Sequence, residues 1–308
     1  MPVRPATFSI VARDPEQEAL GVAVQSKFVS VGSVVPFAAA DAGAIATQSY
    51  ANVAYGPDGL ELLREGADAE TVIEELTAAD EDAESRQIGV VGTDGSVAAY
   101  TGEECLDHAG DRQGDQYTIQ GNILEGPDTI EAMADAYETT DGGLPERLLA
   151  ALEAGNEAGG DRRGEQSAAM YVVKPEGGYD GRNDRWIDVR VDDHESPIAE
   201  LERVFRIYDV TLLERETPED VRELSGPTAA SVLEALAGLG HYDGSPTATF
   251  AADEREALET FRGVNNFENH SLEVLEDALA RGWDDAEGTG ETKLVNAIWQ
   301  GLSRLDRA

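Results

Sequence analysis

The chain has very little of the chemistry on which disulfides and most metal sites depend. Of its 308 residues only one is a cysteine, Cys105, and four are histidines. A single cysteine excludes an internal disulfide and any metal site built from several cysteines. The histidines lie far apart and none has the spacing of an HExxH motif, so we expect no metal and no cofactor.

Long apolar runs are also missing. The most apolar stretch, residues 31–46, is interrupted by Pro36 and Asp41 and is too short to span a bilayer. The first residues, MPVRPATF, have no apolar core of the length found in secretory signals. We therefore expect a soluble, cytoplasmic protein with no membrane partner.

Basic residues are scarce and acidic residues are abundant. Asp and Glu total 62 against 23 Lys and Arg, for a net charge of −39, and the lysines are Lys27, Lys174 and Lys293 alone. The acidic residues are spread along the chain rather than gathered in a tail, and such a field repels nucleic acid and anionic membranes. Because salt screens repulsion between carboxylates, this composition favours a halophilic protein from a high-salt interior.

The order of the segments predicts the fold class. Strand and helix patterns come in blocks rather than alternating singly, which disfavours a doubly wound parallel sheet. We predict an α+β fold, an αββα sandwich of two antiparallel sheets with helices packed outside. The predicted strands are 7–14, 20–27, 33–40, 43–47, 87–93, 96–101, 117–122, 167–174 and 186–191. The predicted helices are 57–65, 69–79, 127–138, 144–154 and 198–213.

A second domain is predicted after the sandwich. The chain turns polar over 214–226, where Pro218 and the Gly226-Pro227 pair interrupt regular structure. We place the boundary so that residues 1–216 form the sandwich and 217–308 form a small all-α domain. Its predicted helices are 229–239, 251–262, 272–281 and 293–305.

The first hairpin carries a candidate catalytic pair. If Asp14 pairs with Leu20, one face is almost wholly apolar and the other places Thr7 opposite Lys27. A hydroxyl beside an ammonium is a plausible catalytic pair, whereas the alternative is an ordinary amphipathic hairpin with a solvated polar side. A dyad of Ser26 with Lys27 is disfavoured because adjacent strand residues point to opposite faces.

Other polar residues are candidates for substrate binding. Ser9 and Gln25 share the polar face of the hairpin with Thr7. Gln120 and Asn122 share one face of strand 117–122, and Asn122 is either an oxyanion donor or a turn-forming asparagine at a strand end.

An arginine pair stands out in so acidic a chain. Arg162 and Arg163 lie between glycines in the loop GGDRRGEQS. They could bind a substrate carboxylate bidentately or pair with the chain's own carboxylates at the surface.

Six motifs in order resemble one known family: TFSIVARD, LGVAVQSKF, VGSVVPFA, ATQSYANVAYGPDGL, YTIQGNIL and GGDRRGEQSAA. Over residues 7–213 the chain resembles the Ntn-hydrolase-like proteins of domain of unknown function 1028. The resemblance implies the αββα fold of Ntn hydrolases, brings no established substrate, and suggests that Asn52 and Tyr55 line the same pocket as the other candidates.

Thr7 matches the N-terminal nucleophile that the resemblance implies. In Ntn hydrolases the nucleophile's own α-amine, with a pKa near 7.7–8.0, serves as the general base. Six residues precede Thr7 in this chain, so Thr7 can act in this way only if the Ala6–Thr7 bond is cleaved.

The C-terminal stretch GLGHYDGSPTATFAADEREALETFRGVNNF resembles the small helical peptidoglycan-binding domains. We therefore expect an amidohydrolase that acts on a small amide or peptide-like substrate through Thr7. The alternative is a non-catalytic ligand-binding or scaffold protein with the same fold, and a weaker third reading is a cell-wall hydrolase. The sequence is also compatible with assembly into a homo-oligomer.

Overall fold

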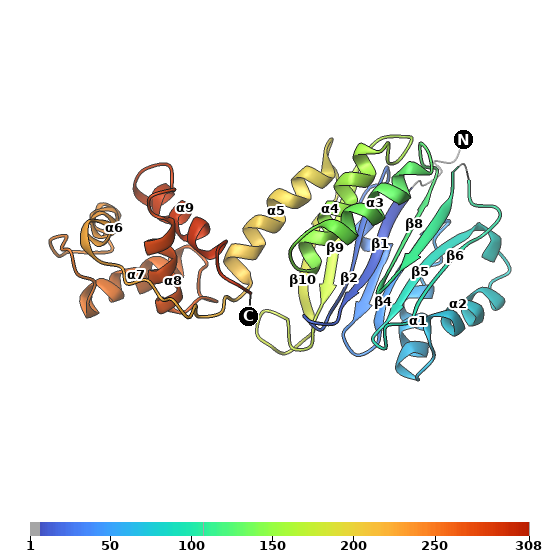
Figure 1. Cartoon of the computed structure of the whole chain (residues 1–308), viewed down its shortest axis with the longest axis horizontal. Coiled ribbons are helices and arrows are strands. Elements are labelled where there is room, and N and C mark those ends of the chain that lie inside the picture. Colours follow the sequence, from blue (N-terminus) through green and yellow to red (C-terminus); the bar gives the residue numbers. More distant parts are fainter. Residues whose placement is uncertain (1–6, 107, 308) are drawn as a thin grey trace. The chain divides into compact units, whose positions relative to one another are not determined.

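A computed structural model of the chain describes residues 7–106 and 108–307 (Figure 1). The chain divides into two compact units, Met1–Phe205 and Arg206–Ala308. Helix α5 (Pro197–Leu212) contains the point of division. The boundary at residue 216 stays a prediction about which part of the chain folds independently.

The first unit contains two antiparallel sheets. One has six strands in the order β10-β9-β2-β1-β8-β7, and the other has four in the order β3-β4-β5-β6. The strands of the first sheet are β1 (Thr7–Asp14), β2 (Ala19–Ser26), β7 (Gly110–Gly114), β8 (Tyr117–Asn122), β9 (Ser167–Val173) and β10 (Arg185–Val191). Those of the second are β3 (Pro36–Ala39), β4 (Gly43–Ser49), β5 (Arg86–Gly92) and β6 (Val97–Thr101).

Helices cover the outer faces of both sheets. Helices α3 (Asp128–Thr139) and α4 (Leu144–Glu157) lie on the six-stranded sheet, and α1 (Tyr55–Arg64) and α2 (Ala69–Ala78) lie on the four-stranded sheet (Figure 1). The predicted αββα sandwich is confirmed. The strand predicted over 33–40 is shorter, because the 3-10 turn η1 (Val31–Ser33) precedes β3.

Small aliphatic side chains fill the space between the sheets. Val22 and Val24 from β2 pack there with Ala44 and Ala46 from β4. The other face of the β1–β2 hairpin is buried too. Phe8 of β1 is fully buried and lies so close to Gly155 of α4 that a Cβ added to this glycine would be 3.4 Å from its ring. The hairpin is therefore buried on both faces, and the predicted arrangement with a solvated polar side does not occur.

The predicted register of the first hairpin is wrong by one residue. Asp14 pairs with Ala19, and Thr7 pairs with Ser26 rather than Lys27. The Asp14 carboxylate accepts hydrogen bonds from the backbone N–H groups that follow it, and Glu18 adopts a left-handed φ of 51°. These features close a loop one residue shorter than expected, so every cross-strand partner shifts.

The second unit is helical, as predicted. Its helices are α6 (Gly226–Gly238), α7 (Ala252–Val264), α8 (Leu272–Gly282) and α9 (Gly290–Leu302). Leu236, Phe261, Leu279 and Ile298 are fully or almost fully buried in its core. A Cβ on Gly301 would lie 2.1 Å from the carbonyl oxygen of Ala278, so glycine is what allows α9 to pass so close to α8.

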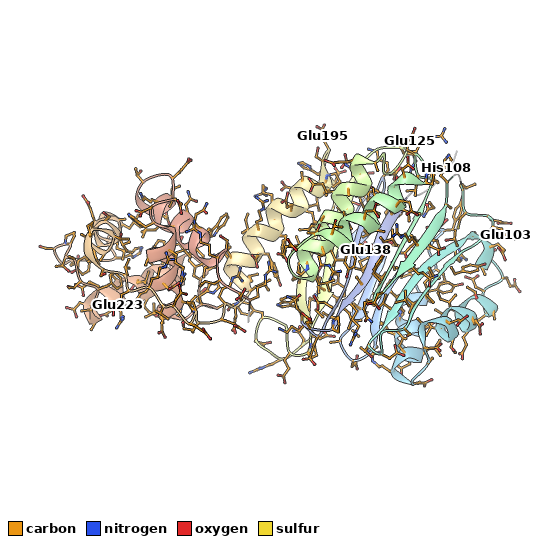
Figure 2. All side chains as sticks on the ribbon, in the orientation of Figure 1. Glu103, His108, Glu125, Glu138, Glu195 and Glu223 are labelled. Atoms are coloured by element: carbon orange, nitrogen blue, oxygen red, sulfur yellow. The ribbon has the colours of Figure 1, made fainter. Side chains whose placement is uncertain are left out.

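Acidic side chains lie on the outside of the first unit. Glu103, Glu125, Glu138 and Glu195 are exposed and project from its surface in Figure 2. Within the described ranges, no helix combines the length and the apolar character needed to cross a bilayer.

Candidate functional site

Thr7 begins β1 and lies between two neighbouring strands. It pairs with Ser26 at the end of β2 and with Asn122 at the end of β8. The hydroxyl oxygens of Thr7 and Ser26 are 3.0 Å apart, and both residues are buried. Three polar side chains from strands far apart in the sequence therefore meet at one edge of the sandwich.

A pocket of about 400 Å³ opens at this edge, and we call it the Thr7 pocket. One part of its lining is polar and includes the hydroxyls of Thr7 and Ser26. The rest comes mainly from the segment after β2 and the segment after β4. The lining residues are Thr7, Ser26, Phe28, Val31, Val34, Val35, Gln48, Ser49, Tyr50, Ala51 and Arg86.

Side-chain amides join the two sheets beside Thr7, and we call this group the amide network. Gln48 accepts from the Ser9 hydroxyl at 2.7 Å and donates to Gln87 Oε1 at 2.8 Å. Gln120 Nε2 donates to Ser9 Oγ at 2.6 Å, and Asn122 Nδ2 donates to Gln87 Oε1 at 3.0 Å. All five residues are buried, and none carries a charge. Such a hydrogen-bonded network fixes the relative position of the strands that carry it.

Asn122 has one amide atom without a partner. Its Oδ1 is buried and accepts no hydrogen bond from the residues that the structure describes. Its Nδ2 group, which the sequence offered as an oxyanion donor, already donates to Gln87. Because Thr7 and Asn122 are directly paired, their side chains share the face between the sheets. The open hydrogen-bonding capacity beside Thr7 thus includes a carbonyl acceptor.

Lys27 lies past the end of β2, away from the position opposite Thr7. Its Nζ donates to the backbone carbonyl of Glu165 at 2.7 Å, and its backbone N–H donates to Asp161 Oδ2 at 2.8 Å. Lys27 and Glu165 line a different pocket, together with His194. The pairing of the Lys27 ammonium with the Thr7 hydroxyl, predicted from the wrong register, is therefore corrected.

The loop GGDRRGEQS, which contains Arg162 and Arg163, binds a carboxylate of the chain itself. Arg163 contacts Asp161 through Nη2 to Oδ2 at 2.9 Å and through Nε to Oδ1 at 3.2 Å. Asp161 is buried, so this pair holds the loop against the backbone of Lys27. The backbone N–H of Arg162 donates to the carbonyl of Ile123, directly after β8.

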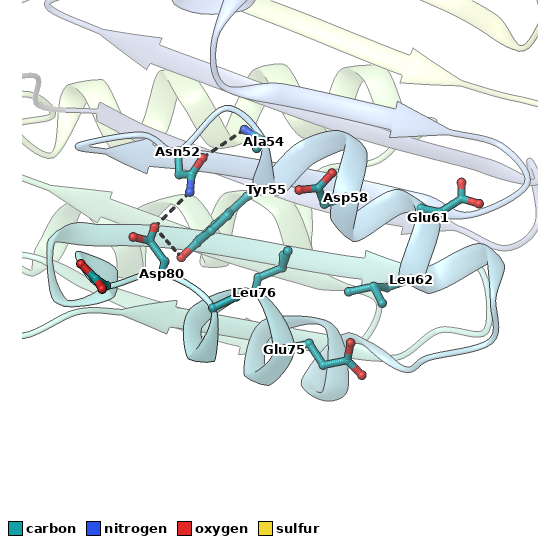
Figure 3. A pocket seen from close by; sticks show the side chains of 11 residues that line it. Asn52, Ala54, Tyr55, Asp58, Glu61, Leu62, Glu75, Leu76 and Asp80 are labelled. Atoms are coloured by element: carbon teal, nitrogen blue, oxygen red, sulfur yellow. Dashed lines mark hydrogen bonds between the residues drawn. The ribbon is translucent and has the colours of Figure 1, made fainter.

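Asn52 and Tyr55 belong to another pocket (Figure 3). Asn52 Nδ2 and the Tyr55 hydroxyl each donate to Asp80 Oδ2 at 3.0 Å, and Arg86 Nε donates to the same oxygen at 2.9 Å. The hydrogen bond from Arg86 is the main reason that the pKa of Asp80 is well below its usual range. Arg86 lines the Thr7 pocket, and its hydrogen bond to Asp80 connects the linings of the two pockets.

Gln25 is separated from Thr7 by the sheet. Gln25 pairs with Phe8, and the adjacent cross-strand pair is Thr7–Ser26. Because adjacent residues of a strand point to opposite faces, the Gln25 side chain points to the helix-covered face. It is fully buried, and its amide has no partner among the residues the structure describes. Ser9 and Gln120, in contrast, lie on the same face as Thr7 within the amide network.

Several residues of the site were not predicted. Gln48 and Gln87 join the amide network, and Ser26 contacts the Thr7 hydroxyl. Ser49 at the end of β4 and Ile123 after β8 have positive φ values of 68° and 50°. Residues other than glycine rarely adopt this conformation, and Ser49 lines the Thr7 pocket. The polar run Gln48-Ser49-Tyr50 was the available signal.

Comparisons with known proteins agree with both sequence resemblances. The model of the family of unknown function DUF1028 matches residues 7–201. A second model, described as "Putative peptidoglycan binding domain", matches residues 211–299. A search of the curated proteins finds no match to the chain.

The solved structures that are similar to the chain include the following two. Protein SPO2555 from Silicibacter pomeroyi, of family model DUF1028, has 32% sequence identity and a TM-score of 0.61, covering 66% of this chain and 86% of that one. HslV from Trypanosoma brucei has 11% identity and a TM-score of 0.38, covering 54% of this chain and 99% of that one. Since the family model spans more than half of the sequence, the chain belongs to the family of unknown function DUF1028.

Proposed function

We propose that the first unit hydrolyses an amide bond and that the Thr7 hydroxyl is the nucleophile, once the Ala6–Thr7 bond has been cleaved. Ala6 lies outside the described residues. The observation that carries the proposal is the position of Thr7, which lines a pocket at the start of the first strand and has its hydroxyl 3.0 Å from a second hydroxyl. The αββα layers are those in which Ntn hydrolases place such a residue.

The proposed reaction needs no group beyond the residue itself and water. The freed α-amine takes the proton of the Thr7 hydroxyl while Oγ1 attacks the carbonyl carbon of the substrate. The resulting ammonium gives that proton to the leaving amine as the C–N bond breaks, which leaves an ester on Oγ1. Water then attacks the ester, again with the α-amine as base, and releases the acid and the free hydroxyl.

Ser26 and Asn122 have positioning roles in this proposal. The Ser26 hydroxyl, within hydrogen-bond distance of Thr7 Oγ1, orients the nucleophile before attack. The unpartnered Oδ1 of Asn122 is an acceptor for the N–H groups of the freed α-amine, because Thr7 and Asn122 are cross-strand partners. A neutral amide stabilises an amine by accepting from it without adding a charge.

The mass of the mature protein tests the proposal. We expect intact-mass spectrometry and N-terminal sequencing to find a chain that begins at Thr7. A β-lactone probe should acylate Thr7 in that chain and should leave Thr7→Ala unlabelled. Thr93→Ala removes an exposed threonine away from the pocket and serves as the matched control, with labelling equal to wild type.

The alternative is a ligand-binding or scaffold protein without catalysis. The Thr7 pocket and the neutral amide network beside it would serve that role equally well. A folded sample that keeps residues 2–6 and takes up no probe at Thr7 would contradict the hydrolase and support the binding protein.

A further inference from the structure

We infer that the Thr7 pocket selects amides whose acyl group is apolar and uncharged. The inference rests on the proposed hydrolase function only for the fate of the bound amide, because the selection is made by the walls of the pocket. Thr7 and Ser26 belong to the same lining as these walls. A carbonyl group held at the Thr7 hydroxyl therefore places its acyl chain against them.

The walls are aliphatic and aromatic. Val31, Val34 and Val35 line the pocket from the segment that precedes β3, and Phe28 and Tyr50 line it from two loops. Val31 and Val35 are buried and belong to the core between the sheets, so this part of the wall is fixed. The volume of about 400 Å³ lies within the range of small-molecule sites.

The side chains that line the pocket offer no free charge to a substrate. Among the described lining residues only Arg86 is charged. Its Nε donates to Asp80 Oδ2 at 2.9 Å and its Nη1 donates to the carbonyl of Tyr50 at 2.6 Å, so the guanidinium is already paired. An acidic acyl group would enter without a partner and against a net charge of −39, and a basic group would find no carboxylate in the lining.

Exposed apolar side chains gather on the two loops that border the pocket. Phe28 is 37% exposed and Tyr50 42%, and their near neighbours in sequence, Val29 and Val53, are 51% and 47% exposed. Of the large apolar side chains exposed in the described part of the first unit, only Tyr179 lies elsewhere in the sequence. Such a cluster of exposed apolar side chains marks a binding surface. An apolar acyl group bound between Phe28 and Tyr50 would remove these side chains from water.

Two fluorogenic amides test the selection by turnover. They are the 7-amino-4-methylcoumarin amides of N-acetyl-leucine and N-acetyl-glutamate, which differ in the charge of the side chain. We expect kcat/KM to be at least tenfold higher for the leucine amide. Val34→Lys places a cation in the wall and should shift this ratio about tenfold toward glutamate. Tyr179→Lys adds the same charge at an exposed position outside the lining and should leave the ratio unchanged.

Binding separates this inference from the hydrolase proposal. Calorimetry with N-acetyl-leucinamide and N-acetyl-glutamate amide, on wild type and on Thr7→Ala, should give at least tenfold tighter binding of the leucine compound. If that preference is found without any turnover, the inference stands and the hydrolase proposal fails. Equal binding of the two amides, a preference for glutamate, or no binding at all would overturn the inference even if coumarin is released. Equal shifts with Val34→Lys and Tyr179→Lys would overturn it as well.

Discussion

The hydroxyl of Thr7 lies 3.0 Å from the hydroxyl of Ser26, its direct partner across the first hairpin. The neighbouring Lys27 instead directs its ammonium to the carbonyl of Glu165. The side chain that can act on the proposed nucleophile is thus Ser26, whereas the sequence placed Lys27 opposite Thr7.

Ser26→Ala should lower turnover about tenfold, because one hydrogen bond contributes about 0.5–1.5 kcal/mol and 1.36 kcal/mol is a factor of ten in rate. Lys27→Met keeps the aliphatic stem and should leave kcat within about twofold of wild type, since the ammonium does not contact Thr7. The measurement is kcat on the N-acetyl-leucine coumarin amide, with circular dichroism to verify folding. Unchanged kcat in Ser26→Ala, together with a large loss in Lys27→Met, would contradict the observed register as the basis of catalysis.

Gln87→Leu should destabilise the sandwich by about 3 kcal/mol or more, because each buried group left without a partner costs about 1–3 kcal/mol. Its Nε2 donates to Thr101 Oγ1, and to the carbonyls of Gly110 and Gly121, at 2.9–3.1 Å. Native-state hydrogen exchange of the β5 and β8 amides measures the effect. Gln113→Leu, at an exposed position of β7, is the matched control and should change exchange little. Equal protection in both variants would show that the amide network adds no stability.

His270 should make the second unit less stable in mild acid. Its Nε2–H donates to the carbonyl of Val210 at 2.8 Å, its buried Nδ1 has no partner among the described residues, and burial lowers its pKa. The unfolded chain, with a histidine pKa near 6.5, therefore binds a proton that the folded chain does not. Below pH 6.5, and down to the lowered pKa, stability should fall by up to about 1.4 kcal/mol per pH unit.

Thermal unfolding between pH 8 and pH 5 measures this dependence. In a Trp186→Phe background the remaining tryptophans, Trp283 and Trp299, report on the second unit alone. His270→Gln should flatten the pH profile, whereas His194→Gln, at an exposed position of the first unit, should leave it as in wild type. A profile that is equally steep with and without His270 would rule out this residue as the cause.

Salt should stabilise the whole protein. With a net charge of −39 and exposed carboxylates such as Glu103 and Glu195, repulsion is weakly screened in dilute buffer (Figure 2). The Debye length falls from about 30 Å at 0.01 M to about 3 Å at 1 M, so Tm should rise by several degrees between tens of millimolar and molar KCl. Calorimetry measures it, and a Tm that does not change over this range would argue against adaptation to high salt.

Much of the fold could be predicted because segment order and periodicity are properties of neighbouring residues. Strand β8 and the helices α1 to α4 have patterns that identify them locally. Strand β7, with the sequence GDRQG, was missed because a short polar strand at the edge of a sheet has no apolar alternation.

The site could be predicted only in part. Resemblance to a known family identified Thr7, and a shared strand face brought Gln120 and Asn122 together. The register failed because both faces of the first hairpin are buried, and alternation then no longer distinguishes one pairing from the next. Gln48 and Gln87 lie 39 residues apart, and nothing in a local pattern says that their amides meet.

The amide network also makes the hydrogen bonds inside the first unit insensitive to the ionic conditions outside. Its members have no ionisable group, so neither protonation nor counterions alter their hydrogen bonds directly. Dilution of the surrounding electrolyte acts first on the surface carboxylates, while the spacing of Thr7 from its neighbouring strands is set by uncharged bonds. Loss of activity at low salt would then result from unfolding of the whole unit. The molecules that stay folded would keep the affinity and turnover measured at high salt.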